Sequence, residues 1–213
     1  PYMVFHVKQN HNDDDQDCLA GLPFNEGQKQ RLRLYADLLI RWQARINLVG
    51  SETIPSLWRR HFLDSAQLFP LVPTDIHRLV DMGSGAGFPG LVLALLGAPD
   101  VHLIESDGRK CAFLREVARV TLTEVTIHNA RIEAVPPLGA DMITARALAP
   151  LDKLLGWAER HLLPQGHCLF LKGRAAQDEL TRAAKDWKLR AERVPSLSDP
   201  SGSILHLSEV RRG

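Results

Sequence analysis

The chain contains few cysteines and no long apolar segment. Its three cysteines, Cys18, Cys111 and Cys168, are odd in number and lack the C-x-x-C spacing of a zinc or redox site. We therefore expect reduced thiols, no bound metal and a cytoplasmic location. No apolar run approaches the roughly 18 residues of a spanning helix, and no secretory signal is visible, so we expect no membrane partner.

A large net charge is also absent. The 213 residues include 26 Lys and Arg against 25 Asp and Glu, which gives a formal net charge of +1. This balance argues against a uniformly basic nucleic-acid-binding protein but permits a local basic face. Hydrophobic residues make up 45% of the chain, as is usual in globular proteins, and the length predicts one domain with a small appendage.

The first third of the chain predicts an extension followed by helices. The acidic run "HNDDDQD" is typical of disorder, so we expect residues 1–22 to form a disordered extension. Apolar residues at steps of three and four predict an amphipathic helix over residues 27–49, and prolines bound a second helix over residues 55–69. We interpret residues 23–76 as an N-terminal helical cap.

Residues 77–213 alternate between strand-like and helix-like segments, which predicts a parallel sheet in an α/β fold. The last two strand-like runs bracket the turn cluster "SDPSG" and predict a terminal antiparallel hairpin. Five α/β units closed by a hairpin give the Rossmann-like sheet of a class I S-adenosylmethionine-dependent methyltransferase, whereas a plain dinucleotide-binding fold continues with a sixth parallel strand. The expected strands are 78–82, 101–106, 124–129, 141–146 and 167–172, and the expected helices are 88–97, 109–120, 150–163 and 176–187.

The stretch "DMGSGAGFPG" (81–90) follows the first expected strand and indicates a ligand. Glycines at a strand-to-helix turn let the backbone approach a ligand where a Cβ atom would collide. Gly85, Gly87 and Gly90 fit the dinucleotide pattern G-x-G-x-x-G. Gly83, Gly85 and Gly87 fit a second pattern, D-x-G-x-G-x-G. The glycines alone do not choose between the two kinds of ligand.

Two acidic residues bear on the choice between the two kinds of ligand. Asp81 precedes Gly83 by two residues, where a carboxylate would repel a pyrophosphate but suits the ammonium and sulfonium groups of S-adenosylmethionine. An alternative role for Asp81 is to cap the loop or the helix. Glu105 ends the next strand, 22 residues after Gly83, which is the place of an acid that binds ribose hydroxyls. Because dinucleotide sites also use an acid at this place, Glu105 indicates a ligand with a nucleoside but does not distinguish a dinucleotide from S-adenosylmethionine.

Seven stretches match one known family in their order along the chain. They are "INLVG" (46–50), "RHFLDS" (60–65), "DMGSGAGFPG" (81–90), "ESDGRKCAFLREV" (105–117), "ARIE" (130–133), "TARAL" (144–148) and "LKGR" (171–174). In combination, from about Leu38 to Leu207, they resemble the RsmG (GidB) family of 16S ribosomal RNA guanine-N7 methyltransferases. The resemblance implies S-adenosyl-L-methionine as cofactor, methylation of guanine N7 as activity, and 16S ribosomal RNA within the small subunit or an assembly intermediate as partner. We expect a monomer.

The resemblance also implies roles for single residues. Ile132 and Glu133 look like the pair that borders the adenine ring. Arg146 matches the family's arginine at the junction of cofactor and substrate and is our expected catalytic residue, orienting a phosphate or the guanine O6. The cofactor-binding residues expected from the loop, the acids and the family together are Asp81, Gly83, Gly85, Gly87, Phe88, Glu105, Ile132, Glu133 and Arg146. Family positions near the reaction face are Asn47, His61, Asp64, Lys172 and Arg174.

Side chains that follow the strand ends, with others from the cap, are expected to form a basic rim for RNA around the cofactor mouth. They are Arg59, Arg60, His61, Arg109, Lys110, Arg131, Arg146, Lys172 and Arg174. Four of the family positions also have simpler interpretations. His61 and Asp64, three residues apart, could bond to each other. Arg146 could be a structural ion-pair partner, and Lys172 could be solvated.

Two other functions compete with methyl transfer. A nicotinamide-dependent oxidoreductase would use the same glycines, but Asp81 and the terminal hairpin count against it. A non-catalytic RNA-binding module with a methyltransferase-like fold would not need the intact glycine loop, Glu105 and Arg146.

Overall fold

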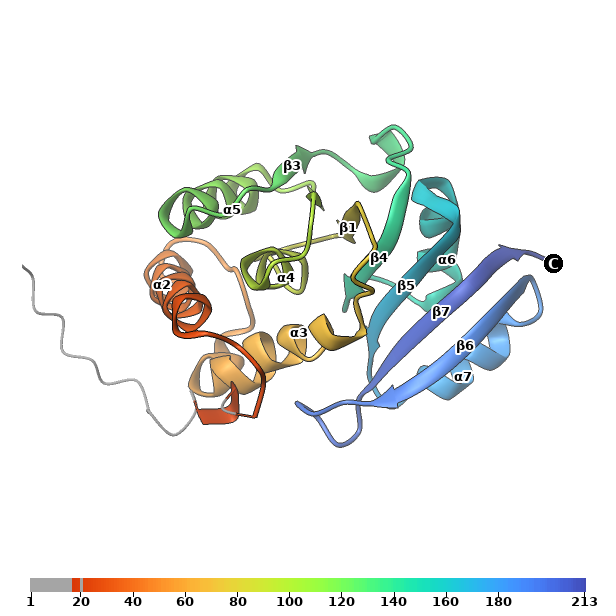
Figure 1. Ribbon diagram of the computed structural model, residues 1–213, viewed down its shortest axis with the longest axis horizontal. Helices are drawn as coiled ribbons and strands as arrows, with labels where there is room; N and C mark the ends of the chain where they lie inside the picture. The colour runs from red at the N-terminus through yellow and green to blue at the C-terminus, as the bar shows by residue number, and fades with distance from the viewer. Residues whose placement is uncertain (1–16, 20) are drawn as a thin grey trace, which may run out of the picture.

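The computed structural model describes residues 17–19 and 21–213 (Figure 1). A seven-stranded sheet with the order β3-β2-β1-β4-β5-β7-β6 forms its centre. Strands β1 to β5 are parallel, and β7 runs antiparallel to both β5 and β6. The predicted α/β class and the terminal hairpin are confirmed. The strands are β1 Leu79–Met82, β2 Val101–Glu105, β3 Thr126–Asn129, β4 Ala140–Arg146, β5 Leu162–Lys172, β6 Trp187–Pro195 and β7 Ser203–Arg212.

Helices cover both faces of this sheet. In Figure 1, α6 and α7 lie behind the β5–β7–β6 part, while α2, α4 and α5 group around the other end of the sheet. No helix in the described part of the chain is long and apolar enough to cross a membrane. The α-helices are α2 Glu26–Gln43, α3 Asp64–Ala66, α4 Gly90–Leu96, α5 Gly108–Thr121, α6 Leu151–His161 and α7 Ala176–Ala183. The short segments are η1 Asp17–Leu19, η2 Ser51–Ser56, the π-helix η3 Trp58–Leu63, η4 Phe69–Leu71 and η5 Ile132–Ala134.

Alternate side chains of the central strands enter two hydrophobic clusters, because successive residues of a strand point to opposite faces. Leu79 and Leu103 pack with the cap, α4 and α5. Val80 and Ile104 pack with α6 and α7 on the other face. All residues of β1 and β2 are buried, as expected for parallel strands covered on both sides. The carboxyl ends of these strands are therefore held in place by core packing.

The first cap helix ends earlier than the predicted 27–49. Helix α2 stops at Gln43 because the side chain of this residue binds the segment that follows. Its Oε1 atom accepts hydrogen bonds from the backbone N–H groups of Leu48 (2.9 Å) and Val49 (3.1 Å), and its amide donates to the Val49 carbonyl (2.8 Å). Residues 44–49 therefore turn back instead of continuing the helix.

The second predicted helix, 55–69, is a composite of η2, the π-helix η3 and α3. Pro55 lies inside η2 rather than at a helix start. π-Helices are rare and occur frequently at functional sites. This one faces the carboxyl ends of the sheet strands, where its side chains line the cleft described below.

The described part of the predicted extension is folded. Asp17–Leu19 forms η1, and Leu19 is 4% exposed within the cluster that also contains the cap and α4. The expectation of disorder is wrong for these residues, while residues 1–16 and 20 lie outside the described part. The cap shares one hydrophobic core with the sheet, so the proposed boundary after residue 76 does not divide the core.

Candidate active site

The carboxyl ends of the parallel strands border a cleft of about 1310 Å³. Residues that follow β1, β2, β3, β4 and β5 line it, together with residues of η3 and of the β6–β7 turn. This edge is where open α/β sheets bind ligands. The volume exceeds the roughly 300–1,000 Å³ of a single small-molecule site. The cleft therefore has room for a cofactor and for a nucleotide beside it.

Three glycines of the loop after β1 have left-handed backbones, with φ of +66° at Gly83, +58° at Gly85 and +100° at Gly87. Gly83 and Gly85 line the cleft. Gly87 does not, contrary to our expectation of a cofactor contact. A Cβ atom there would collide with the Tyr35 hydroxyl and lie 2.9 Å from Leu91 Cβ. Gly87 therefore allows the loop to pack tightly against α2 and α4.

We expect Gly87→Ala to lower the free energy of unfolding by about 2–3 kcal/mol, because a strained backbone and a buried methyl group must both be accommodated. Gly85→Ala is the matched control. Its φ is also positive, but the nearest atom to the new Cβ lies 3.9 Å away, so we expect a loss of about 1 kcal/mol. Urea denaturation measures both losses, and equal values would show that packing at Gly87 is not the cause.

Asp81 lies beneath the glycine loop and not in the cleft, which differs from the predicted cofactor contact. Its side chain is completely buried and accepts a hydrogen bond from the Thr144 hydroxyl at 2.7 Å, while its Oδ2 atom has no partner among the described residues. A Cβ atom at Gly90 would lie 2.8 Å from Asp81 Cγ, so Gly90 lets α4 begin directly against this carboxyl group. Burial raises the pKa of Asp81 to about 6, although the Thr144 hydrogen bond acts in the opposite direction.

The raised pKa of Asp81 predicts how the stability of the protein depends on pH. Because the pKa in the folded state lies above the ordinary 3.8, the folded protein binds the proton more readily between about pH 4 and pH 6. The free energy of unfolding therefore falls as the pH rises through this window, by about 3 kcal/mol for this group. Asp81→Asn keeps an acceptor for Thr144. We expect the variant to be more stable than wild type at pH 7 and about equal at pH 4 in chemical denaturation; equal stability at pH 7 would contradict this.

Glu105 lies at the end of β2, 9% exposed, and lines the cleft. Its carboxylate accepts backbone hydrogen bonds from Gly85 (2.8 Å) and Asp107 (2.7 Å). A carboxylate oxygen has a second acceptor position, so these bonds orient Glu105 and leave it able to accept from ribose hydroxyls. Ile132 and Glu133 of η5 line the cleft beyond it. The structure thus brings the expected ribose and adenine contacts together.

Phe88 is the centre of an aromatic cluster at the base of the cleft. It is 3% exposed, follows the glycine loop and is joined to Pro89 by a cis peptide bond. Its ring stacks on Tyr35 of α2 at 5.3 Å between centroids. The guanidinium carbon of Arg146 lies 5.0 Å from the centroid of the Phe88 ring, in a cation–π contact. Phe88 therefore connects the loop, the cap and Arg146.

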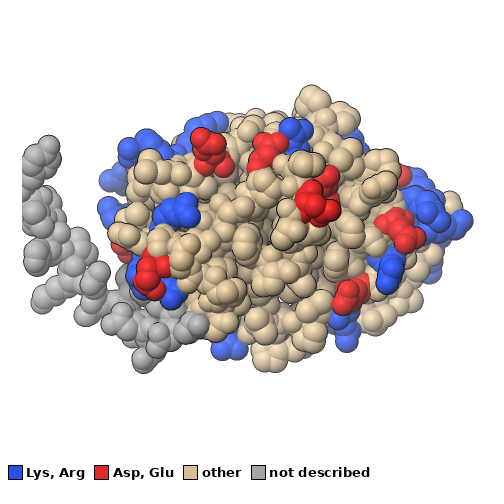
Figure 2. All heavy atoms as spheres, viewed as in Figure 1, with Lys and Arg blue, Asp and Glu red and all other residues tan. Residues whose placement is uncertain are grey.

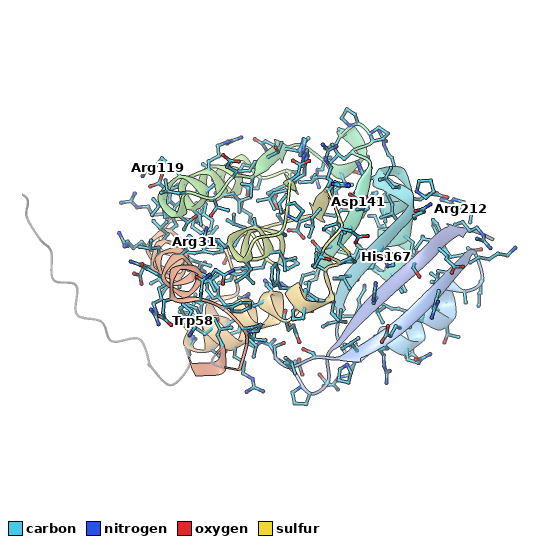
Figure 3. All side chains as sticks on the ribbon, viewed as in Figure 1. Arg31, Trp58, Arg119, Asp141, His167 and Arg212 are labelled. Atoms are coloured by element: carbon cyan, nitrogen blue, oxygen red, sulfur yellow. The ribbon has the colours of Figure 1, made fainter. Side chains whose placement is uncertain are left out.

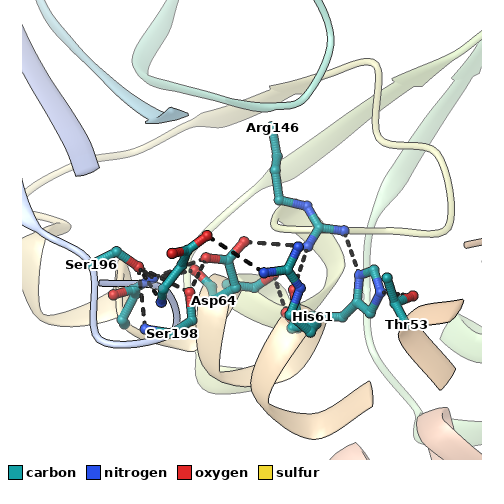
Figure 4. Close-up of polar contacts among 10 residues, drawn as sticks. Thr53, His61, Asp64, Arg146, Ser196 and Ser198 are labelled. Carbon is teal, nitrogen blue, oxygen red and sulfur yellow. Dashed lines mark hydrogen bonds and ion pairs between the residues drawn. The ribbon is translucent and has the colours of Figure 1, made fainter. Parts of the chain in front are cut away.

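Arg146, at the end of β4, is bound by a single turn of the cap (Figure 4). One terminal nitrogen donates hydrogen bonds to the Arg60 carbonyl (3.0 Å) and to Asp64 Oδ2 (3.3 Å). The other donates to His61 Nδ1 at 2.9 Å. His61 and Asp64 thus both contact Arg146, and the alternative of a bond between the two is not observed. The side chains of Arg146 and Asp64 are each 17% exposed.

These contacts determine the state of His61. A guanidinium group can only donate, so Nδ1 of His61 must accept, and its Nε2–H then donates to the Thr53 hydroxyl at 2.7 Å. Burial, followed by the positive charge of Arg146, lowers the pKa of His61 to about 3. His61 is therefore neutral at physiological pH, and both of its ring nitrogens are engaged.

The predicted basic rim is only partly assembled. Arg60, His61, Lys110, Arg131, Arg146 and Lys172 line the cleft, whereas Arg59, Arg109 and Arg174 are not among its lining residues. On the face seen in Figure 2, Lys and Arg lie mostly at the periphery, with acids between them, and form no continuous patch.

Several of these basic residues have partners within the protein. Arg60 pairs with Asp199 and Arg109 with Asp107. The Lys172 ammonium group, in a side chain 9% exposed, donates to Glu179 Oε2 and to the Ala149 carbonyl, both at 2.7 Å. Arg59 donates to the Ser198 carbonyl at 3.0 Å. Lys172 and Arg59 hold segments of the protein in place, which differs from the expected contacts with phosphate.

Four contributors to the site were not identified from the sequence. Tyr35 is part of an apolar stripe that predicts only a helix. The signal "SDPSG" predicts a turn but not its location opposite η3. The four residues are Tyr35, Glu179, Ser196 and Ser198.

Comparison with known proteins agrees with this geometry. The family model GidB, described as rRNA small subunit methyltransferase G, matches residues 28–206. Proteins named ribosomal RNA small subunit methyltransferase G are similar to the chain. The protein from Paramagnetospirillum magneticum is 72% identical over 184 residues, which cover 86% of this chain and 90% of the relative. That from Rhodospirillum rubrum is 52% identical over 193 residues, which cover 91% and 96%.

Solved structures show the same fold at low sequence identity. M. jannaschii TYW2 in complex with AdoMet has a TM-score of 0.57 and is 18% identical, with 80% of each chain covered. The T. thermophilus 16S rRNA N2 G1207 methyltransferase RsmC, in complex with AdoMet and guanosine, has a TM-score of 0.52 and is 15% identical, with 68% of this chain and 38% of that chain covered. These likenesses confirm the class I methyltransferase fold, and the family model and the relatives together cover most of the sequence. The chain therefore belongs to the GidB family of ribosomal RNA small subunit methyltransferases G.

Proposed function

We propose that this enzyme transfers the methyl group of S-adenosylmethionine to N7 of a guanine in 16S ribosomal RNA. The observation that carries the proposal is the position of Arg146, which lines the cleft, lies over Phe88 and is held by three bonds to the cap. Family membership supports the reaction class and the RNA substrate.

The residues around the cleft fit S-adenosylmethionine better than a dinucleotide. Residues 81–90 contain no Lys or Arg that would neutralise a pyrophosphate. Pro89 occupies the N-cap of α4 and has no N–H group to donate to phosphate oxygens. Glu105 has acceptor capacity for ribose hydroxyls, and Ile132 offers an apolar surface to an adenine ring.

The chemistry requires orientation more than proton transfer. S-adenosylmethionine supplies a methyl group activated by a positively charged sulfur. Guanine N7 has an in-plane lone pair and no proton, so no general base is needed. His61 is neutral and bonded at both ring nitrogens, which agrees with a supporting role. Arg146 retains donors for guanine O6 or for a phosphate, and positioning of the two reactants can lower the barrier by roughly 7–11 kcal/mol at best.

The assembled small subunit is the more suitable substrate. Among the described residues, the basic side chains of the cleft that remain as candidates for phosphate contacts are Lys110, Arg131 and Arg60, of which Arg60 is half-exposed and pairs with Asp199. Few phosphate contacts imply modest, salt-sensitive affinity for free RNA. We further propose that the protein acts as a monomer and that contacts with the folded subunit supply the remaining specificity.

Two measurements test this function. The first maps N7-methylguanine in 16S ribosomal RNA from cells with and without the gene, and an unchanged pattern would overturn the proposal. The second compares methyl transfer to protein-free 16S RNA and to intact small subunits. We expect faster transfer to subunits, and equal rates would reject the assembled substrate. Tryptophan quenching by NADH without binding of S-adenosylhomocysteine would favour the oxidoreductase instead.

A further inference from the structure

Asp64 contacts both Arg146 and the β6–β7 turn. Its Oδ2 atom accepts from Arg146 at 3.3 Å. Its Oδ1 atom accepts a short hydrogen bond from the Ser198 hydroxyl and one from Gln67 Nε2 at 3.2 Å. Figure 4 shows the three groups in a row, with Asp64 between Arg146 and the serines of the turn.

The turn is part of the same cleft. Ser196, Ser198 and Asp199 line it together with Arg146 and the glycine loop. The turn also presents Leu197, 59% exposed, to the outside. It follows β6 and lies at the end of the sheet away from the glycine loop, so its side of the cleft is where RNA, and not the cofactor, would lie.

We propose that Asp64 is a positioning residue that sets the orientation of Arg146 and the position of the β6–β7 turn together, so that RNA seated against the turn meets a correctly oriented Arg146. This inference rests on the proposed function and assigns Asp64 a role that acts through Arg146 and the turn.

The chemistry of the three partners requires a carboxylate. Arg146, the Ser198 hydroxyl and the Gln67 amide all act as donors toward Asp64. A carboxylate has only acceptors and satisfies all three, whereas an amide has one acceptor atom and one donor atom. Asp64→Asn therefore keeps the shape of the side chain but must turn its NH₂ group toward either Arg146 or the turn. Toward Arg146, two donors would face each other and that link would be lost. Toward the turn, the Gln67 bond would be lost and the Ser198 hydroxyl would have to accept instead of donate. Either orientation disturbs the arrangement of Arg146 and the turn.

Other bonds hold the turn when this link is broken. Arg59 donates to the Ser198 carbonyl at 3.0 Å, and the Leu197 N–H donates to Gln67 Oε1 at 2.7 Å. Arg60 pairs with Asp199 at 3.5 Å. None of these bonds involves Arg146. Removal of the Asp64 link is therefore expected to change the position of Arg146 relative to the turn, while the turn itself stays in place.

The experiment is a double-variant cycle on small subunits as substrate, with Asp64→Asn, Ser198→Ala and both together. We expect Asp64→Asn to lower kcat/KM for the subunit about 30-fold and Ser198→Ala about 5-fold, with the double variant no worse than Asp64→Asn. The dissociation constant of S-adenosylhomocysteine should stay within about 3-fold. Glu159→Gln is the acid-to-amide control, since Glu159 of α6 pairs with Arg212 at the end of β7 (Figure 3) and does not line the cleft; it should be as active as wild type.

Several outcomes of this cycle would overturn the inference. Additive losses, or near-normal activity of Asp64→Asn, would overturn the inference. A parallel loss of S-adenosylhomocysteine binding would show general damage and would also overturn it.

The guanidinium NMR signal of Arg146, identified by its absence in Arg146→Lys, gives a readout independent of activity. It should shift in Ser198→Ala although Ser198 does not touch Arg146, and an unshifted signal would reject the link even if Asp64→Asn failed to fold. Lack of methyl transfer by the wild type would reject the proposed function, while the NMR result would still decide the positioning role.

Discussion

Arg146→Ala is expected to lower kcat/KM for methyl transfer by about 10²–10³-fold and to leave the protein folded. The loss is of the size seen when one preorganised donor is removed from an active site. Arg146 is held over Phe88 and bonded to three acceptors of the cap, so its orientation is fixed before substrate binds. The fold should persist because Asp64 keeps its bonds to Ser198 and Gln67.

The variant Arg146→Lys tests whether activity depends on the positive charge of Arg146 or on the planar shape of its guanidinium group. Lysine retains the positive charge, but one ammonium group does not reproduce a planar fork that bonds His61 and Asp64 at once. We expect an activity between those of wild type and Arg146→Ala. Steady-state methyl transfer, with thermal unfolding as a check on folding, measures both variants. Near-normal turnover of Arg146→Ala would refute its role at the reaction centre.

The sequence predicted the sheet well because its signals are local. Alternating short apolar strands and helices, with the "SDPSG" turn at the end, were sufficient for the order of the strands and the antiparallel hairpin. The start of β5 was wrong, since this strand begins at Leu162 and not at 167. Glu105 and the glycines were located for the same reason, since a strand end followed by glycine is a local pattern. The limits of α2 were wrong because they depend on a side-chain contact, in which Gln43 binds the backbone of residues 48 and 49.

Features that depend on tertiary contacts were not predictable in this way. Asp81 and Gly87 belong to the predicted motif, yet neither lines the cleft. Asp81 is buried beneath the loop, and Gly87 packs against Tyr35 and α4. Ser198 lies 134 residues from Asp64, and no local pattern connects the two. In the sequence, Lys172 is a basic residue at the end of a strand, where a contact with phosphate is expected. Only its burial against Glu179 in the structure identifies it as a structural residue.

Glu179→Ala is expected to lower the free energy of unfolding by about 3–5 kcal/mol, because it leaves the Lys172 ammonium group buried without its counter-charge. Glu179 Oε2 accepts from Lys172 and from the Leu151 N–H, each at 2.7 Å. Lys172 also holds the Ala149 carbonyl, so the pair fixes the loop between Arg146 and α6. We therefore expect Glu179→Ala to reduce methyl transfer as well, even at temperatures where it is folded.

The double variant Lys172→Met, Glu179→Leu decides whether Lys172 serves structure or RNA. Replacing a buried ion pair by apolar residues of similar size is often neutral, so most of the stability should return in chemical denaturation. If Lys172 contacted a phosphate, its loss would reduce the slope of log K against log salt for RNA binding by about 0.7–0.9. We expect an unchanged slope, because the ammonium group is already bonded to Glu179 and Ala149. A reduced slope would show that Lys172 contacts RNA after all. The positive control is Arg60→Met, which removes an exposed cation of the cleft and should reduce the slope in the same assay.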